Sequence, residues 1–264
     1  MATWPIFQIA TFSNEPFAGN PAFVLVAEAP MTFEVADLVR VQLREQVLAV
    51  ITPGHEAPHV EFVTKNGYHS GPSHSMHAAA WVAFNRLDLA EATLGLRLSG
   101  GGVRTVHRNG SLISVEWTPI SSRQSDRSQA IANAIGLVTV ETLCSSFGTV
   151  AVVESEKALL EMVPNLAAIS ALDTETLIVT ALSAVADFTV RVFAPRLDLP
   201  EDPVCGTAHR VIAPYWAQRL GRTSLIARQG SARGGEVLCQ LTDDRILISG
   251  RAVPFLEGRI DCQL

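Results

Sequence analysis

The sequence predicts an α+β protein with two strand-rich halves, mainly antiparallel sheets and one notable helix in each half. Three observations support this prediction: many short apolar or alternating segments bounded by turn residues, a polar stretch near the middle of the chain, and a helical segment on each side of it. With 264 residues, of which 48% are hydrophobic, the chain has enough apolar material for two cores.

The strand predictions rest on short runs of alternating or continuous apolar residues. They cover residues 6–11, 22–26, 59–63, 103–107, 112–117, 150–154, 177–182, 188–193, 236–241 and 245–249. Asn109-Gly110 lies between two of these runs and predicts a hairpin, because both central residues of a type I′ turn need a positive φ. Strands joined by hairpins imply mainly antiparallel sheets.

Residues 118–128 (TPISSRQSDRS) form the one long polar stretch that is rich in turn and linker residues. Because this stretch falls near the middle of the chain, it predicts a domain boundary. We expect a first domain over residues 1–118 and a second over 119–264, whose last residues can return to the first.

Two predicted helices stand out. Residues 73–84 are small or apolar on every face, which suits a helix that is buried on all sides. Residues 207–220 follow a Pro-Val-Cys-Gly turn and end at Gly221, a favourable residue after a helix. Pro214 inside this second helix removes a backbone hydrogen bond and predicts a kink.

Both helices begin with small residues that include a hydroxyl and a histidine: Ser73, His74 and Ser75 in the first, Thr207 and His209 in the second. A helix N-terminus offers unpaired N–H groups and a partial positive charge, so the two starts together would hold a carboxylate well. The structural alternative is ordinary N-capping by serine or threonine.

A third helix is predicted over residues 33–45. Its expected buried positions are Val35, Leu38, Val39 and the aliphatic part of Gln42, and its expected outward positions are Glu34, Asp37, Arg40 and Arg44. Glu45 follows Leu38 by seven residues and should share the buried stripe. Its carboxyl is then either satisfied by local donors or has a raised pKa that suits proton transfer.

Composition excludes several classes of protein. The formal net charge is −6 and no long basic block occurs, so nucleic acid is not an expected partner. The first residues lack the pattern of a signal peptide and no apolar run approaches the ~20 residues of a membrane span, so we expect a soluble cytoplasmic protein. Cys144, Cys205, Cys239 and Cys262 are scattered, which predicts neither a disulfide framework nor a metal site.

Several segments carry a resemblance to a known family. Residues 17–22 (FAGNPA), 71–75 (GPSHS), 201–209 (EDPVCGTAH) and 229–235 (QGSARGG) occur in this order, with Glu45 after the first. They resemble the F-x-G-N-P-A, L-C-G-H-A, E-D-P-V-T-G-S-A-H and Q-x-S-x-R-G-G segments of the phenazine biosynthesis-like (PhzF-like) isomerases. The resemblance spans nearly the whole chain.

The resemblance implies the diaminopimelate-epimerase-like fold: two similar domains, each a curled, mainly antiparallel sheet around a central helix, with the active site between them. It implies a homodimer and a cofactor-independent isomerase that shifts a proton and a double bond in a small unsaturated cyclic carboxylic acid, of phenazine or pyrroline type. The implied catalytic residues are Glu45, His74 and Asp202, and the expected substrate-binding residues are Gly19, Ser73, Ser75, Gly206 and Thr207.

The chain also departs from the family pattern. After the glutamate the family often reads x-N-L-S-E-T, whereas residues 46–51 here read QVLAVI. Tyr68 stands near the place of a second glutamate, and Lys65 replaces a proline. Because polar positions that line the substrate have become apolar, we expect a substrate other than the standard phenazine precursor.

The chemistry needs one carboxyl with a near-neutral pKa, which removes a proton from carbon and returns one on the same face. Glu45 is the candidate for this shuttle. His74, Asp202 and the Thr207 hydroxyl would position the substrate and stabilise the developing charge. For Gly19 and for the loop 231–235 the alternative is a tight turn that needs a positive φ.

Two other functions remain open. The first is a two-base racemase of the same fold, which would need a cysteine before each central helix. Cys205 fits one place, but Pro72 occupies the other. The second is a non-catalytic protein that binds a small acid, which the altered residues 46–51 favour and the intact 201–209 segment opposes.

Overall fold

The computed structural model describes residues 2–54 and 57–262. The chain divides into two compact units: unit 1 contains Met1–Glu116 and Ser249–Leu264, and unit 2 contains Trp117–Ile248. The chain leaves and re-enters unit 1 within two strands, β8 (Leu112–Trp117) and β16 (Ile246–Cys262). The first crossing lies just before the polar stretch 118–128, and that stretch itself contains a short strand, β9 (Ser122–Gln124).

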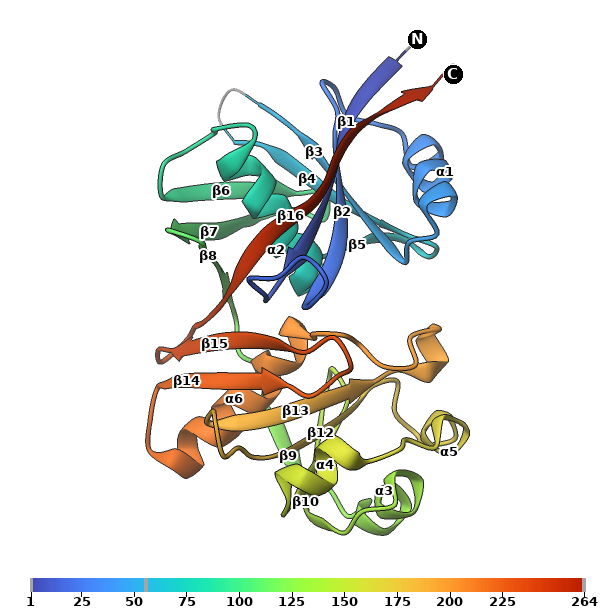
Figure 1. Ribbon diagram of the computed structural model, residues 1–264, viewed down its shortest axis with the longest axis vertical. Helices are drawn as coiled ribbons and strands as arrows, with labels where there is room; N and C mark the ends of the chain where they lie inside the picture. The colour runs from blue at the N-terminus through green and yellow to red at the C-terminus, as the bar shows by residue number, and fades with distance from the viewer. Residues whose placement is uncertain (1, 55–56, 263–264) are drawn as a thin grey trace. The chain divides into compact units, whose positions relative to one another are not determined.

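Unit 1 is a sheet that closes on itself. The strand order is β1-β2-β3-β4-β6-β7-β8-β16, and β16 also pairs with β1, while β5 pairs with β4 (Figure 1). Besides β8 and β16, the elements of unit 1 are β1 (Ala2–Thr11), β2 (Asn20–Val26), α1 (Phe33–Leu43), β3 (Val47–Thr52), β4 (His59–Thr64), β5 (Gly67–His69), α2 (Ser73–Asn85), β6 (Thr93–Leu98) and β7 (Val103–Asn109).

Helix α2 is the centre of unit 1. It contacts β1, β2, β3 and β7, and every residue from Ser75 to Phe84 is buried. No face of α2 is left for solvent, which explains why its sequence lacks a polar side. The prediction of a helix that is buried on all sides is therefore confirmed.

Unit 2 is an open sheet with the strand order β15-β14-β13-β12-β11-β10-β9. Helices α3, α4 and α5 contribute with β11, β12 and β13 to one apolar core of unit 2. The elements of unit 2 besides β9 are α3 (Ser128–Ile135), β10 (Thr139–Ser145), β11 (Thr149–Val153), α4 (Glu156–Glu161), α5 (Leu166–Ser170), β12 (Leu177–Leu182), β13 (Phe188–Phe193), the 3₁₀ helix η1 (Pro195–Leu197), α6 (Gly206–Leu220), β14 (Ser224–Gln229) and β15 (Gly235–Leu241).

Helix α6 packs on β14 and β15 and buries Val211, Ile212 and Trp216. The Trp216 indole N–H donates to the Thr180 hydroxyl on β12 at 3.0 Å, which anchors the middle of the helix. The helix ends at Gly221, whose φ of 63° lies in the left-handed region, as its sequence predicted. None of the helices in the described part of the chain has the length and apolar character needed to cross a bilayer.

Most strand pairs among the described residues are antiparallel, as predicted, and the parallel pairs are β2–β3, β4–β6, β11–β12 and β13–β14. The predicted hairpin joins β7 to β8, but its turn is displaced by one residue. Asn109 pairs with Leu112, so Gly110 and Ser111 form the turn, and of these only Gly110 has a positive φ (59°). This pattern is that of a type II′ turn rather than type I′.

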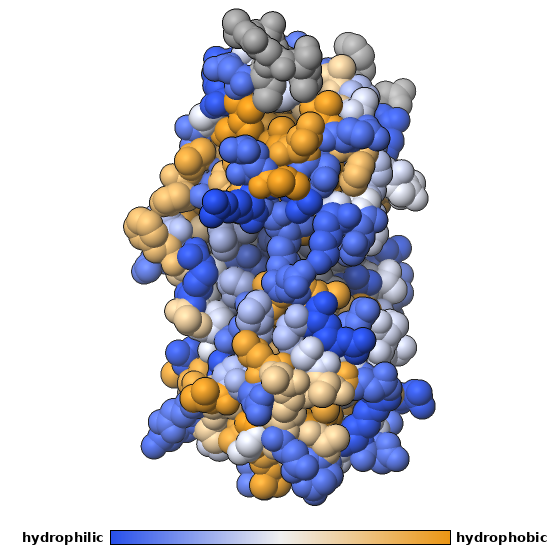
Figure 2. Space-filling view, turned by 90° about the vertical axis from the view of Figure 1, so that its right-hand side faces the viewer, coloured by the Kyte–Doolittle hydropathy of each residue, from blue (hydrophilic) through white to orange (hydrophobic). Residues whose placement is uncertain are grey.

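The expected orientation of α1 is wrong. Its buried residues are Ala36, Val39 and Arg40, whereas Leu38 is 66% exposed. Figure 2 faces the side of unit 1 that carries α1 and shows apolar side chains among polar ones there. The helix turns its smaller Ala36–Val39 side to β3 and β4, because the Arg40 guanidinium finds partners below the surface: the Asp37 carboxylate at 2.7 Å and a backbone carbonyl.

Candidate active site

Glu45 lies two residues beyond the end of α1, so its partial burial does not come from a helical stripe through Leu38. Arg44 ends the helix in the left-handed conformation with a φ of 59°. The Glu45 N–H donates to the Arg40 carbonyl at 3.1 Å, and the Arg40 Nη1 donates to the Glu45 carbonyl at 2.6 Å. The backbone of Glu45 is thus fixed on both sides by one buried arginine.

The hydrogen bonding of the Glu45 side chain differs from that of its backbone. Its carboxyl has no hydrogen bond or ion pair with any residue that the structure describes, and burial alone raises its pKa above the ordinary value. A carboxyl that is held in place, half-buried and raised in pKa is suited to taking up and releasing a proton. Of the two alternatives left open by the sequence, the structure therefore favours the raised pKa over local donors.

The first turn of α2 carries three of the predicted site residues. The Ser73 and Ser75 hydroxyl oxygens are buried without a hydrogen-bond partner within the described residues, and Pro72 supplies no side-chain cap. Plain N-capping by these serines is therefore not what the structure shows. Unsatisfied buried hydroxyls are costly in an empty site and favour a polar ligand.

His74 is partly buried in the same turn. Burial, followed by the charges of His77 and His69, lowers its pKa to about 4. The imidazole is therefore neutral at physiological pH, and it offers one donor and one acceptor rather than a positive charge.

Two other histidines reveal an internal similarity between the units. The His77 Nδ1 lies 2.7 Å from the Ser73 carbonyl in α2, and the His209 Nδ1 lies 2.9 Å from the Cys205 carbonyl in α6. Because a carbonyl only accepts, Nδ1 carries the proton in both rings. By helix N-cap position Cys205 corresponds to Pro72, as the sequence indicated, and the two histidines differ by one residue in their separation from that cap.

The loop before α6 carries Asp202, Cys205 caps the helix, and Gly206 and Thr207 begin its first turn. The Cys205 thiol donates to the Asp202 carboxylate, and burial and the charge of Asp202 raise the thiol pKa well above its ordinary value. The neighbouring Ala208 and Thr207 amides oppose this rise but do not cancel it. Cys205 is thus a protonated hydrogen-bond donor to Asp202, not a thiolate.

The loop that carries Asp202 is held from several sides. The Arg191 guanidinium donates two parallel hydrogen bonds to the Glu201 carboxylate, at 2.8 and 2.9 Å, and two more to the Leu159 and Met162 carbonyls. The Asp202 N–H donates to the Val192 carbonyl at 2.9 Å. These contacts tie the loop to β13 and to the end of α4.

The segment 229–235 holds the same loop. The Gln229 Nε2 donates to the Asp202 carbonyl at 3.3 Å, and the Ser231 hydroxyl donates to the Pro203 carbonyl at 2.6 Å. The two motifs of the second half are therefore one interlocked structure. Ser231 supports the 201–209 loop in this way, and the positive φ in its loop falls on Gly234 (67°).

The backbone conformation and the close surroundings of residue 19 require glycine. Its φ is 65°, and a Cβ at this position would lie 2.1 Å from the Thr11 carbonyl oxygen. No L residue with a side chain fits there without moving β1. The turn requirement therefore accounts for Gly19, and its role as a substrate contact stays a prediction.

Tyr68, which stands near the place of a second family glutamate, has a carboxylate partner. Its phenol donates to Glu61 on β4, a buried residue whose pKa is raised mainly by burial. The change to tyrosine at this position thus preserves a link to a carboxyl group, now provided by Glu61.

The predicted residues fall into local groups. Ser73, His74 and Ser75 share the first turn of α2, and Gly206 and Thr207 share that of α6, with Asp202 in the loop before it. Glu45 follows α1, and Gly19 precedes β2. Sequence reasoning missed Arg40 and Arg191, because only tertiary contacts show that these arginines are buried. In the described part of the chain no three His, Cys, Asp or Glu side chains are grouped as metal ligands would be.

Comparison with known proteins gives a consistent result. Residues 108–258 match the family described as phenazine biosynthesis-like protein. An uncharacterized isomerase from Pseudomonas aeruginosa is 34% identical over 96% of this chain and 97% of its own length. The crystal structure of a PhzF family phenazine biosynthesis protein from Enterococcus faecalis is 29% identical, covers 99% of this chain and 100% of its own, and has a TM-score of 0.94.

More distant structures share the fold alone. A hydroxyproline epimerase from Agrobacterium vitis has a TM-score of 0.62 at 11% identity and covers 98% of this chain and 92% of its own. This similarity shows that the chain shares its fold with that epimerase.

Proposed function

Because this chain belongs to the phenazine biosynthesis-like (PhzF) family, we propose that it is a cofactor-independent isomerase that shifts a proton and a double bond in a small unsaturated cyclic carboxylic acid. The observation that carries this proposal is the Glu45 carboxyl, which is half-buried, unpaired among the described residues and raised in pKa. It stands where the resemblance placed the family's catalytic glutamate. The relatives named as uncharacterized isomerases support the same class of reaction.

The proposed reaction needs no oxidant or reductant. The Glu45 carboxylate takes a proton from a substrate carbon, and the electron pair of that C–H bond enters the conjugated system as a dienolate or enamine. The resulting carboxylic acid returns its proton to another carbon on the same face, and the double bond moves. Glu45 ends as it began, so one residue serves as base and as acid.

The other residues bind and position the substrate. The neutral His74 imidazole and the free Ser73 and Ser75 hydroxyls supply hydrogen bonds in unit 1. Asp202 and the Thr207 hydroxyl supply them in unit 2, where the Cys205 thiol orients the Asp202 carboxylate. Donors that are fixed before the reaction stabilise the charge as it develops.

The rival racemase is not favoured. A two-base racemase needs a thiolate or an equally basic group on each face of the substrate carbon, whereas the pKa of Cys205 is raised and Pro72 stands at the equivalent N-cap position of α2. The alternative of a non-catalytic protein that binds a small acid predicts binding without proton exchange, so one experiment separates it from the isomerase.

The proposal is tested with unsaturated cyclic acids of the dihydroanthranilate and pyrroline-carboxylate types, incubated in D₂O and followed by NMR. An isomerase shifts the double bond and incorporates solvent deuterium at carbon, unless the shuttled proton is fully retained. Binding without any double-bond shift across this panel would instead support the non-catalytic protein.

Substitution of the shuttle residue provides the sharper test. Glu45→Gln keeps size and hydrogen bonding but removes the base, so kcat should fall ~10²–10⁴-fold with little change in KM. The matched control is Glu34→Gln, in the exposed first turn of α1, which should leave both constants unchanged. Near-normal turnover by Glu45→Gln would refute the proposed shuttle and make His74 and Asp202 the next candidates.

A further inference from the structure

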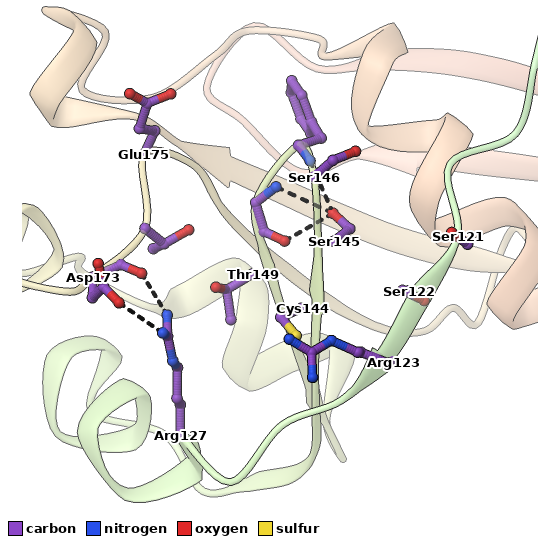
Figure 3. A pocket seen from close by; sticks show the side chains of 13 residues that line it. Ser121, Ser122, Arg123, Arg127, Cys144, Ser145, Ser146, Thr149, Asp173 and Glu175 are labelled. Carbon is purple, nitrogen blue, oxygen red and sulfur yellow. Dashed lines mark hydrogen bonds and ion pairs between the residues drawn. The ribbon is translucent and has the colours of Figure 1, made fainter.

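Unit 2 contains a hollow of about 590 Å³ that the proposed reaction does not use. Its walls come from four segments: the residues around β9, Arg127 before α3, the turn between β10 and β11, and the stretch Asp173–Glu175 before β12 (Figure 3). None of the candidate active-site residues lines it. The hollow therefore needs a separate explanation.

Thr149 is the buried polar residue of this hollow. It is only 3% exposed, and its N–H donates to the Thr176 carbonyl at 2.9 Å, which fixes the residue. Its hydroxyl has no hydrogen bond to any residue in the described ranges, and Figure 3 shows it directed toward the Arg127 side of the hollow. Because Thr149 lines the hollow, its hydroxyl is available there as a hydrogen-bond donor and acceptor for a ligand.

The charges around the hollow favour an anion. Arg127 is held by Asp173, whose carboxylate accepts from Nη2 at 2.7 Å, so this pair is close to neutral. Arg123, on β9, has no ion pair or hydrogen bond from its guanidinium within residues 2–54 and 57–262. The Glu175 carboxylate is directed away from both guanidinium groups (Figure 3). One uncompensated positive charge thus faces the hollow.

Further hydroxyls line the same hollow. Ser121 and Ser122 adjoin Arg123 along the chain, and Ser146 lies in the β10–β11 turn on the opposite wall. Their side chains accept and donate no hydrogen bond among the described residues. A planar guanidinium and hydroxyl groups in one hollow can bind the oxygens of carboxylate and phosphate groups, with which arginine can form two parallel hydrogen bonds.

From this geometry we infer that the hollow is a second ligand site, which binds a small metabolite that carries a carboxylate or phosphate group. Arg123 pairs with the anionic group, Thr149 donates to it from the floor, and the serines hydrogen-bond its other oxygens. The Asp173–Arg127 pair fixes one wall. This inference does not depend on the proposed isomerase activity, because the site shares no residue with it.

Binding is tested by isothermal titration calorimetry with two probes at matched ionic strength: citrate for carboxylates and inorganic phosphate for phosphates. At least one probe should bind, and the stronger probe identifies the ligand class. Arg123→Gln and Thr149→Val should each weaken binding by about tenfold or more, since each removes a hydrogen bond to an ionised group. The control Arg259→Gln, at an exposed arginine of unit 1, should leave binding unchanged.

A second readout uses Cys144, a half-buried free thiol that also lines the hollow. Its alkylation by iodoacetamide, followed by peptide mass spectrometry, should slow when the better probe is present. In Arg123→Gln this protection of Cys144 should disappear. Thr149→Val is tested in the same way, once its thermal unfolding transition has been shown to match that of the wild-type protein. The inference would be overturned if neither probe bound. It would also be overturned if Arg123→Gln and Thr149→Val both retained wild-type binding and wild-type protection of Cys144.

Discussion

At the scale of single residues, the most informative side chain is that of Glu45, whose carboxyl has no hydrogen bond or ion pair among the residues that the structure describes. Because burial raises the pKa of Glu45, ionising this carboxyl costs more in the folded protein than in the unfolded chain. Its contribution to stability is therefore fully present below the pKa of the unfolded state, about 4.3, and is lost as pH rises through the folded pKa. At pH values above the folded pKa of Glu45, the ionised carboxyl therefore makes folding less favourable.

The raised pKa of Glu45 predicts how the stability of a Glu45 variant depends on pH. Glu45→Gln should raise the melting temperature at pH 7, and the difference from wild type should vanish near pH 4, where both states hold a neutral side chain. Differential scanning calorimetry at the two pH values measures it, with Glu34→Gln as the control that should show no such gap. A variant that is less stable than wild type at pH 7 would contradict the burial argument.

Cys205 gives a second prediction at this scale. Its thiol serves as a donor to Asp202 and stays protonated, so another small donor should replace it. Cys205→Thr should retain most of the isomerase activity, measured as initial rate on the substrate found in D₂O. Complete loss in a variant that is still folded would bring back the thiol-based racemase.

At the scale of elements, the loop after β13 depends on one buried arginine. Arg191 is 7% exposed and links Glu201 to the carbonyls of Leu159 and Met162. Because Glu201 precedes Asp202 directly, this link fixes the start of the loop that holds the predicted site residue.

Removing only this arginine should be strongly destabilising. Arg191→Met leaves the Glu201 carboxylate without its partner and should cost ~3–5 kcal/mol in the free energy of unfolding, measured with urea. The control Lys157→Met breaks a pair whose side chains are 81% and 67% exposed and should cost less than ~1 kcal/mol. The double variant Arg191→Met/Glu201→Leu should recover part of the loss. Equal losses of unfolding free energy in Arg191→Met and Lys157→Met would contradict the role of Arg191 in holding this loop.

Some helices and strands could be predicted from the sequence and others could not. The two helices α2 and α6 were predictable because their small or apolar faces and their end signals are local. Strand β3 (VLAVIT) was missed, because a continuous apolar run without alternation and without clear turn residues beside it does not identify a strand. Helices α4 and α5 have six and five residues, too few for a 3.6-residue period to be recognised.

The same distinction applies to the site. Ser73, Ser75 and the Asp202 loop could be proposed from hydroxyls, histidines and motifs at helix starts. The orientation of α1 could not, because the buried position of Arg40 depends on Asp37 and on the Glu45 carbonyl, which meet only in the folded chain. The prediction for Glu45 therefore named the right kind of environment for the wrong geometric reason.

At the scale of the whole molecule, buried histidines set the response to acid. His74 and His209 have pKa values lowered to about 4, mainly by burial, against about 6.5 in the unfolded chain. The unfolded chain therefore takes up protons first, and the stability that is fully present above pH 6.5 is lost as pH falls toward 4.

Urea unfolding at pH 7.5, 6 and 4.5 should show this loss. Carboxylates with lowered pKa values, such as Glu141 and Glu156, act only below about pH 4.5 and do not contribute in this window. His74→Gln combined with His209→Asn, which keeps a donor for the Cys205 carbonyl, should flatten the profile. An unchanged slope in the double variant would show that other groups control acid stability.

The return of the chain to unit 1 has a consequence for synthesis on the ribosome. Strand β1 pairs with β16 from Ala2↔Cys262 to Thr11↔Ala252, so β1 is synthesised well before its partner strand β16. Unit 2 is continuous in sequence and can complete its sheet while the end of the chain is still being translated. Until residues 249–264 emerge, unit 1 keeps an open sheet edge, and a nascent chain that stalls there exposes β1 to strand pairing with other molecules.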